Sequence, residues 1–547
     1  MPPRSHRIWR AWASYWLAPG GRLSLAVLRI ALATSLLWML WRYHDGWDFS
    51  SARYYKLGPW LLWPGGRPGP GLVHVLTVIA WLSTSAMLVG LFSRASHAVS
   101  LFCLIALAAY GVSDAPTWSH YDVPPLLASF AFLGARSGDT ISLDALLRRR
   151  RGVTVPSPRQ TSARLVQLTV VSVFFVAALW KLRTGGLAFG WALSDNMRHQ
   201  LLARYDWISA ERPPLANWLI DSAWRYRTAA TLNMISQLTP ISAPFLFRYP
   251  RLRALLAILF ILEVLGLGYV MLLWNLHWLP LAAAFVDWDA LAAWVRRKRG
   301  QLTDEPLVSS SPRRARAHLA FVTTFLLFYS LQAVWLNQRL RAFPFSSFPL
   351  FATLRAKQPL DEHQTYELLG GHIEVLGNRP LLPEEDVFLH TRVTYRWMFR
   401  ARDHKTVAQD LHVILDDVRR IWPSLDIKGV RLWLSVYQAP AYPAAARLDR
   451  HDLGILGEMY LDERVHTALG SLGADGMTVT STESVEVAGA RASVSLDLAP
   501  TPTPLASTTT ATGLVLSSPL VGDPAYLVVT DRDGTPWIAG FRSRGSY

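Results

Sequence analysis

The chain has 547 residues, of which 51% are hydrophobic, a formal net charge of +16 at pH 7 and a single cysteine, Cys103. Several apolar stretches are about 17–22 residues long, which excludes a purely soluble multidomain protein and indicates a polytopic membrane protein. A single cysteine excludes an intrachain disulfide. The arginines gather in short segments between the apolar stretches, a pattern typical of cytoplasmic loops. We therefore expect a lipid bilayer, and no nucleic acid, as partner. The basic segments are residues 148–151, 248–253, 296–299 and 313–316.

The apolar stretches predict nine transmembrane helices. Residues 1–22 are basic and rich in tryptophan without a compact apolar core, so we expect no cleavable signal peptide and an uncleaved first span. With a cytoplasmic N-terminus, nine spans place all basic loops in the cytoplasm and everything after residue 337 outside. We predict an integral protein of a bacterial plasma membrane. The predicted spans are residues 23–41, 72–92, 98–114, 121–135, 165–182, 228–247, 254–273, 274–289 and 318–336.

The predicted domains are a transmembrane domain at 1–300, a basic cytoplasmic loop with the last transmembrane helix at 301–337, and a β-rich (α+β) extracytoplasmic domain at 338–547. Alternation of apolar and polar residues in "YELLGGHIEVLG" and "GVRLWLSVYQA" predicts strands, and "AYLVVTDRDGTPWIAGF" predicts a hairpin. The Pro- and Thr-rich stretch "APTPTPLASTTTATG" predicts a linker or a loose loop.

One amphipathic helix is predicted in the C-terminal domain, within "HKTVAQDLHVILDDVRRIW". Val407, Leu411, Ile414 and Val418 recur at helical spacing and form its apolar face. We expect this face to pack on the strands.

Polar side chains near the outer ends of several predicted spans form the candidate site. Charged groups within spans are costly in hydrocarbon and are functional candidates by default. Each has a structural alternative: Lys181 near a span end often extends to the interface, His120 suits a loop or helix cap, and His277 beside tryptophans suits an aromatic belt. The topology gathers these residues in one outer layer, where they could line a pocket: Trp118, His120, Asp122, Lys181, Asn275 and His277.

Two further charges lie deeper in predicted spans. Arg29 is about seven residues, or roughly 10 Å, from the cytoplasmic end of its span, and Glu263 is about ten residues, or roughly 15 Å, from the end of its own. Because an unpaired charge at such depth is costly, we expect Arg29 and Glu263 to form a structural ion pair.

Common catalytic motifs do not occur in the sequence. There is no His-Glu-x-x-His metal motif, no Walker loop, no Gly-x-Gly-x-x-Gly after a strand and no Gly-x-Ser-x-Gly elbow. The outer layer has no cysteine ligand and no histidine pair at i and i+4. We predict no metal site.

The order and spacing of several short segments resemble those of the vitamin K-dependent γ-glutamyl carboxylases and the wider family with horizontally transferred transmembrane (HTTM) domains. The resemblance covers roughly residues 20–290. It rests on "SLAVLRIALATSLL", "LSTSAMLVGLFSRASHAVSLFCLIA", "TWSHYD", "RSGDTISLDALL" and "VFFVAALWKLRTGG", the last similar to the family pattern Tyr/Phe-Phe-x-x-Gly-x-x-Lys-Leu.

The resemblance implies a membrane enzyme in which Lys181 takes a proton from a reduced quinone of the vitamin K or menaquinol type, with His120 as its pocket partner. Oxygen and carbon dioxide would be co-substrates, and a glutamate of a secreted or membrane peptide would be carboxylated. An amine in an apolar site is disfavoured as ammonium, so it can act as a base near neutrality.

The sequence also departs from the carboxylase pattern. Ala178 stands where the carboxylases have glycine, Glu263 where they have a histidine, and Gly266 where an asparagine sits. Two alternatives therefore stay open: a membrane enzyme with other quinone or lipid chemistry, and a non-catalytic membrane scaffold whose outer domain binds partners.

Overall fold

The computed structural model describes residues 4–42, 54, 56–113, 122–153, 158–186, 189–205, 211–246, 249–299, 312–335, 366–382, 404–439, 442–443, 449–462, 465–466, 471–473, 476–479, 491–495, 503–505, 507–510, 513–516, 526–530 and 535–541. The chain divides into two compact units. The first comprises Met1–Phe49, Arg53–Thr184 and Thr231–Ala352, and the second comprises Ser50–Ala52, Gly185–Ala230 and Thr353–Tyr547.

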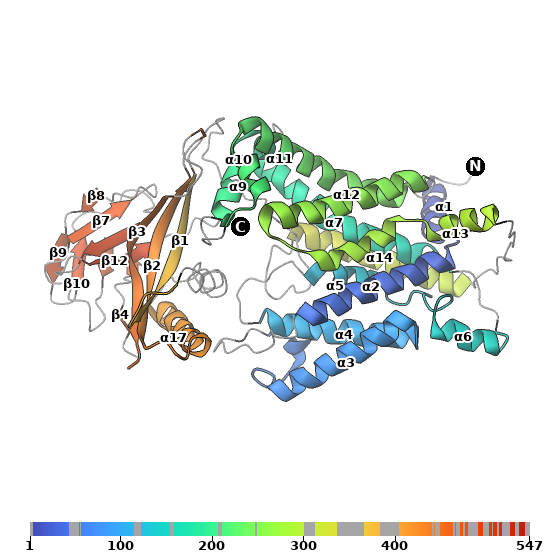
Figure 1. Cartoon of the computed structure of the whole chain (residues 1–547), viewed down its shortest axis with the longest axis horizontal. Helices are drawn as coiled ribbons and strands as arrows, with labels where there is room; N and C mark the ends of the chain where they lie inside the picture. Colours follow the sequence, from blue (N-terminus) through green and yellow to red (C-terminus); the bar gives the residue numbers. More distant parts are fainter. Residues whose placement is uncertain are drawn as a thin grey trace. The chain divides into compact units, whose positions relative to one another are not determined.

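The first unit is built from helices (Figure 1). The helix α11 (Ala223–Leu238) begins in the second unit and ends in the first. The other helices of the first unit are α1 (Arg4–Trp16), α2 (Arg22–Arg42), η1 (Gly58–Leu62), α3 (Pro70–Val89), α4 (Ser93–Gly111), α5 (Val123–Phe132), α6 (Leu143–Arg150), α7 (Thr161–Gly185), η3 (Thr239–Phe245), α12 (Pro250–Met271), η4 (Leu276–Phe285), α13 (Trp288–Lys298) and α14 (Pro312–Trp335).

Five helices are long and apolar enough to cross a membrane: α2, α3, α4, α7 and α12. A sixth span exists if the bent pair of η4 and α13 counts as one. These five confirm the corresponding predicted spans and indicate an integral membrane protein. Of these five helices, α3 has the smallest buried share. Large apolar side chains such as Val75, Ile79 and Leu82 are exposed on it, as a surface in contact with lipid requires. Apolar helices of 10–17 residues, α5 and residues 316–327, are too short to meet the same criterion.

Prolines change the form of two other predicted spans. Residues 228–247 comprise the end of α11 followed by the 3-10 helix η3, which carries Pro240 near its start. The predicted span 274–289 contains the 3-10 helix η4 around Pro280 and the first residues of α13, which follows at an angle of 64°. Proline lacks the N–H that a continuous α-helix requires, so neither stretch is one straight α-helix.

The second unit contains short helices in a stretch for which the sequence indicated only a long connection, residues 183–227. They are α8 (Gly190–Leu193), α9 (Asn196–Tyr205), α10 (Pro214–Ile220) and the start of α11. The helix α17 (His404–Ile421) is the predicted amphipathic helix, and its four expected apolar residues, Val407, Leu411, Ile414 and Val418, are all fully buried in the core of this unit.

The strands of the second unit form two sheets. The larger has eight strands in the order β1-β2-β3-β12-β11-β7-β8, with β4 paired to β3, and the smaller has the order β5-β6-β10-β9. The predicted strands and the predicted hairpin β11–β12 are confirmed. The expected linker is wrong in part, because residues 503–505 and 507–510 form β8 and β9. The strands are β1 (Tyr366–Gly377), β2 (Ile427–Ala439), β3 (Asp449–Tyr460), β4 (Val465–His466), β5 (Ser471–Gly473), β6 (Gly476–Val479), β7 (Arg491–Ser495), β8 (Thr503–Leu505), β9 (Ser507–Thr510), β10 (Gly513–Leu516), β11 (Tyr526–Thr530) and β12 (Pro536–Phe541).

Candidate functional site

Lys181 lies near the C-terminal end of α7 and is only 2% exposed. Its Nζ donates to Asn233 Oδ1 at 2.7 Å and to Gln237 Oε1 at 3.0 Å. Both acceptors belong to α11, so the amino group is held within the helical unit and does not extend into water.

Glu263 of α12 completes the same network. Asn233 Nδ2 and Gln237 Nε2 each donate to Glu263 Oε1 at 2.6 Å, and Ser236 Oγ donates to Oε2 at 2.7 Å. Residues 233, 236 and 237 have the i, i+3, i+4 spacing that places side chains on one face of a helix. We call these five residues, Lys181, Asn233, Ser236, Gln237 and Glu263, the Lys181 network.

The two carboxamides of the network have the same orientation. Their oxygens face the lysine and their NH₂ groups face the carboxylate. This alignment stabilises an ammonium at one end and a carboxylate at the other, and each buried polar group obtains a partner. Lysine can lose and regain its proton in such surroundings, which arginine cannot.

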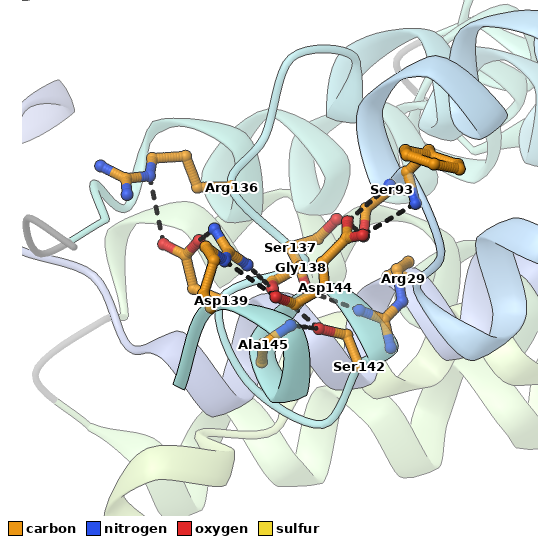
Figure 2. Close-up of polar contacts among 11 residues, drawn as sticks. Arg29, Ser93, Arg136, Ser137, Gly138, Asp139, Ser142, Asp144 and Ala145 are labelled. Carbon is orange, nitrogen blue, oxygen red and sulfur yellow. Dashed lines mark hydrogen bonds and ion pairs between the residues drawn. The ribbon is translucent and has the colours of Figure 1, made fainter. Parts of the chain in front are cut away.

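The predicted ion pair between Arg29 and Glu263 is wrong. Arg29 is fully buried, and its guanidinium donates to the backbone oxygens of Ser137 at 2.7 Å and Ile141 at 2.5 Å. Figure 2 shows Arg29 directed toward the loop that carries Ser137. Main-chain carbonyls accept from both terminal nitrogens of the arginine, and the carboxylate on α12 has other donors.

The loop that holds Arg29 is itself fixed by Asp144 of α6. Asp144 accepts hydrogen bonds at 2.8 Å from the backbone N–H groups of Phe92 and Ser93, and a third from Ser93 Oγ at 2.7 Å (Figure 2). Burial raises the pKa of Asp144, but these hydrogen bonds from Ser93 and Phe92 outweigh burial and lower the pKa below its ordinary value. We call Arg29, Ser93, Ser137, Ile141 and Asp144 the Arg29 clamp.

Three of the other predicted site residues lie in the described part of the chain. Asp122 and His277 are buried and come together, with His277 Nε2 3.8 Å from Asp122 Oδ1. Asn275 is also buried and lies immediately before η4, which contains His277. Trp118 and His120 lie outside the described residues. The structure thus brings together Asp122 and His277, while Lys181 joins residues of α11.

A second buried polar cluster lies in the second unit, and sequence reasoning missed it. Tyr226 donates to Asp195 Oδ1 at 2.5 Å, and Arg227 Nη2 is 3.2 Å from the same oxygen. Arg198 and His199 of α9 are at most 1% exposed. Burial, and then the hydrogen bond to Asp195, raise the pKa of Tyr226. The run "SDNMRHQ" is polar, which predicts exposure, whereas all seven of its residues are buried.

Comparison with models of known protein families finds no match, and comparisons with curated proteins and with solved structures find none either. Among the described residues, no group of three or more His, Cys, Asp or Glu side chains could hold a metal ion.

Proposed function

We propose that this membrane protein is an enzyme in which Lys181 accepts a proton from a lipid-soluble substrate. The observation that carries the proposal is the Lys181 network: a buried amine held by two carboxamides that connect it to a carboxylate. A purely structural lysine near a span end would extend toward the interface, whereas this one is 2% exposed.

The network supports proton transfer through its preorganisation. When Lys181 takes up a proton, the new positive charge meets two amide oxygens that already face it, with Glu263 behind them. Groups oriented before the reaction need no reorganisation, and their effect is stronger where water is excluded. The amides of Asn233 and Gln237 would therefore act as positioning residues for Lys181.

A reduced quinone is the substrate that we propose for this site, on the basis of the resemblance to the γ-glutamyl carboxylases. The residues fit such a group, because a quinol hydroxyl requires a proton acceptor and an apolar enclosure, and Lys181 is an acceptor within a bundle of apolar helices. When bound, a reduced quinone would supply the reducing equivalents that carboxylases use with oxygen and carbon dioxide to carboxylate a peptide glutamate. We also propose His120, Trp118, Asp122, Asn275 and His277 as pocket residues.

The orientation that suits this function is also a proposal. Nine spans with a cytoplasmic N-terminus would place the C-terminal domain outside a bacterial plasma membrane, where it would meet a secreted or membrane peptide. The arginine-rich segments support this orientation.

Mass spectrometry of the host's proteins tests the proposal. We expect γ-carboxyglutamate in cells with the wild-type protein, and at least 100-fold less with Lys181→Met, which keeps the length of the side chain and removes the amine. Lys298→Met is the matched control, because Lys298 is exposed on α13. A modification that persists at the wild-type level in Lys181→Met would remove the lysine from the chemistry.

A non-catalytic scaffold is the second candidate function. Strand β1 lies at the end of the larger sheet, and among the described strands it pairs only with β2. Such an edge can accept a strand from a partner. If γ-carboxyglutamate is absent and Lys181→Met leaves the phenotype of the wild-type gene unchanged, the scaffold function is favoured. A changed phenotype without γ-carboxyglutamate favours other quinone or lipid chemistry.

A further inference from the structure

A cleft lies at the end of the helical unit where three membrane-length helices begin. Its lining includes Ser24 near the start of α2, Arg159 and Gln167 at the start of α7, and Arg253 near the start of α12. The cleft has about 440 Å³ of empty space, including its open mouth. None of these residues belongs to the Lys181 network or to the predicted outer pocket.

The charge of the cleft favours an anion. Arg253 is 2% exposed, lines the cleft and forms an ion pair with Asp287, in which Nη2 lies 3.0 Å from Oδ2. Asp287 also lines the cleft and offsets Arg253, so Arg159 gives the lining an excess of one positive charge. The carboxylate of Asp289 next to the cleft is already occupied, because it accepts from the backbone N–H groups of Leu23 and Ser24.

The orientation of the helices also favours an anion in the cleft. The helices α7 and α12 present their first turns here, and the N-terminal end of a helix carries partial positive charge. The first turn of α2 also lies here, but Asp289 already caps it. Helix ends alone would not define a ligand, but here they surround a cleft lined by two arginines.

Gln167 gives the cleft a more specific feature. The residue is 1% exposed, and its Nε2 donates to the backbone oxygen of Ala284 at 2.5 Å, which fixes the orientation of the amide. Its Oε1 is buried and has no hydrogen-bond partner among the described residues. An unsatisfied buried oxygen is costly, so a ligand that supplies a hydroxyl donor would be favoured.

We propose that this cleft binds a phosphate ester that carries a neighbouring hydroxyl group, such as the headgroup of phosphatidylglycerol. Arg159 and Arg253 would hold the phosphate, since arginine matches phosphate oxygens with paired N–H donors. Gln167 Oε1 would accept from the hydroxyl. A lipid source suits a cleft at the end of membrane-length helices, where basic residues attract anionic headgroups. A soluble phosphate ester has the same recognition chemistry.

Binding to the purified full-length protein in detergent tests this site. The probes are dioctanoyl phosphatidylglycerol, dioctanoyl phosphatidylcholine, which has no headgroup hydroxyl, and soluble glycerol phosphate. We expect phosphatidylglycerol to bind at least tenfold more tightly than phosphatidylcholine. Arg159→Gln and Gln167→Met should each weaken phosphatidylglycerol binding about tenfold, because each removes a polar contact to the ligand. Arg297→Gln, on an exposed arginine of α13, is the charge-matched control.

The outcomes distinguish a lipid ligand from a soluble one, and a specific site from general attraction to surface charge. Much weaker binding of glycerol phosphate identifies a lipid ligand, whereas equally tight binding with the same variant pattern identifies a soluble phosphate ester. Equal binding of the two lipids overturns the proposal. So does an equal loss in Arg297→Gln and Arg159→Gln, because general surface charge would then explain the binding. Thermal unfolding of each variant shows that it is folded, and Arg253 is left intact because loss of its ion pair would disturb the fold.

Discussion

Arg29 and Lys181 are both buried basic side chains of the helical unit, but different kinds of group hold them. Arg29 donates to two backbone carbonyls of a loop that Asp144 fixes. Lys181 donates to two side chains that in turn bind Glu263. Backbone carbonyls of a fixed loop suit a permanent charge, whereas a network of side chains can respond when a proton arrives or leaves.

The kind of partner distinguishes a structural role for Arg29 from a chemical role for Lys181, whereas burial does not, because both side chains are buried. Arginine stays charged in proteins, so the Arg29 clamp can only hold α2 against the loop. Lysine titrates, and the carboxamides around Lys181 are arranged for its charged form. Both residues are charged or titratable groups within predicted spans, and only their partners distinguish them.

The largest effect is expected for Arg29→Met. This change leaves the buried carbonyl of Ser137 and the partly buried carbonyl of Ile141 without their donor. A buried acceptor that loses its donor costs about 1–3 kcal/mol. We expect the free energy of unfolding to fall by about 3–5 kcal/mol, with a matching loss of expressed protein. Unfolding followed by tryptophan fluorescence measures it, with Arg149→Met on an exposed arginine as control. A change below about 1 kcal/mol would mean that the clamp is not structural.

Substitutions in the Lys181 network should have a smaller effect on stability than Arg29→Met, but they should also abolish activity. Lys181→Met leaves Glu263 without its countercharge and should reduce stability by about 1–3 kcal/mol, and Glu263→Gln in the same protein should restore part of that loss. Activity should be absent in both the single and the double variant. Recovery of activity with stability in the double variant would show that the lysine only supports the fold.

The fold was predictable where a pattern is long and regular. Long apolar stretches located α2, α3, α4, α7 and α12, and helical spacing identified the buried face of α17. Lys181 and Glu263 were recognisable because charges in apolar helices are rare. The i, i+4 pair of amides, Asn233 and Gln237, was also visible in a segment that is polar in places, and it was the available signal for the partners of Lys181.

The true partners of Arg29 could not be predicted in the same way. Every residue carries a backbone carbonyl, so Ser137 and Ile141 have no distinguishing side-chain signature. Only the conformation of the loop decides that their oxygens face α2. The proposed pairing with Glu263 followed from depth alone, and depth does not specify the rotation of a helix about its axis.

A smaller effect is expected at Gly90, which follows α3 with φ of 71°. A Cβ there would lie 2.3 Å from Ser142 Cβ and 2.7 Å from Arg29 Nη1, so Gly90→Ala should disturb the Arg29 clamp. We expect a loss of about 1–3 kcal/mol in the free energy of unfolding. Gly134→Ala separates strain from crowding, since Gly134 has φ of 79° but open space around its Cβ position. Equal losses in both variants would exclude crowding of the clamp.

The smallest effect is the pH dependence of the clamp. The pKa of Asp144 lies below its ordinary value in the folded state, because hydrogen bonds from Ser93 and Phe92 outweigh burial. Its contribution to stability is therefore present above the unfolded-state pKa and is lost as the pH falls through the folded-state pKa. Asp144→Asn should flatten the decline in stability below about pH 4 in acid unfolding curves. An unchanged slope would mean that Asp144 does not contribute through its charge.

Chemical rescue tests the central claim, that Lys181 is the proton acceptor, most directly. Lys181→Ala removes the amine and leaves space for a small one, so ethylamine or propylamine should restore γ-carboxyglutamate formation in proportion to the concentration of free amine. Neither amine should alter the rate of the wild-type protein or of Lys298→Ala. A folded Lys181→Ala protein that keeps the wild-type rate, or that stays inactive at saturating amine, would contradict the account.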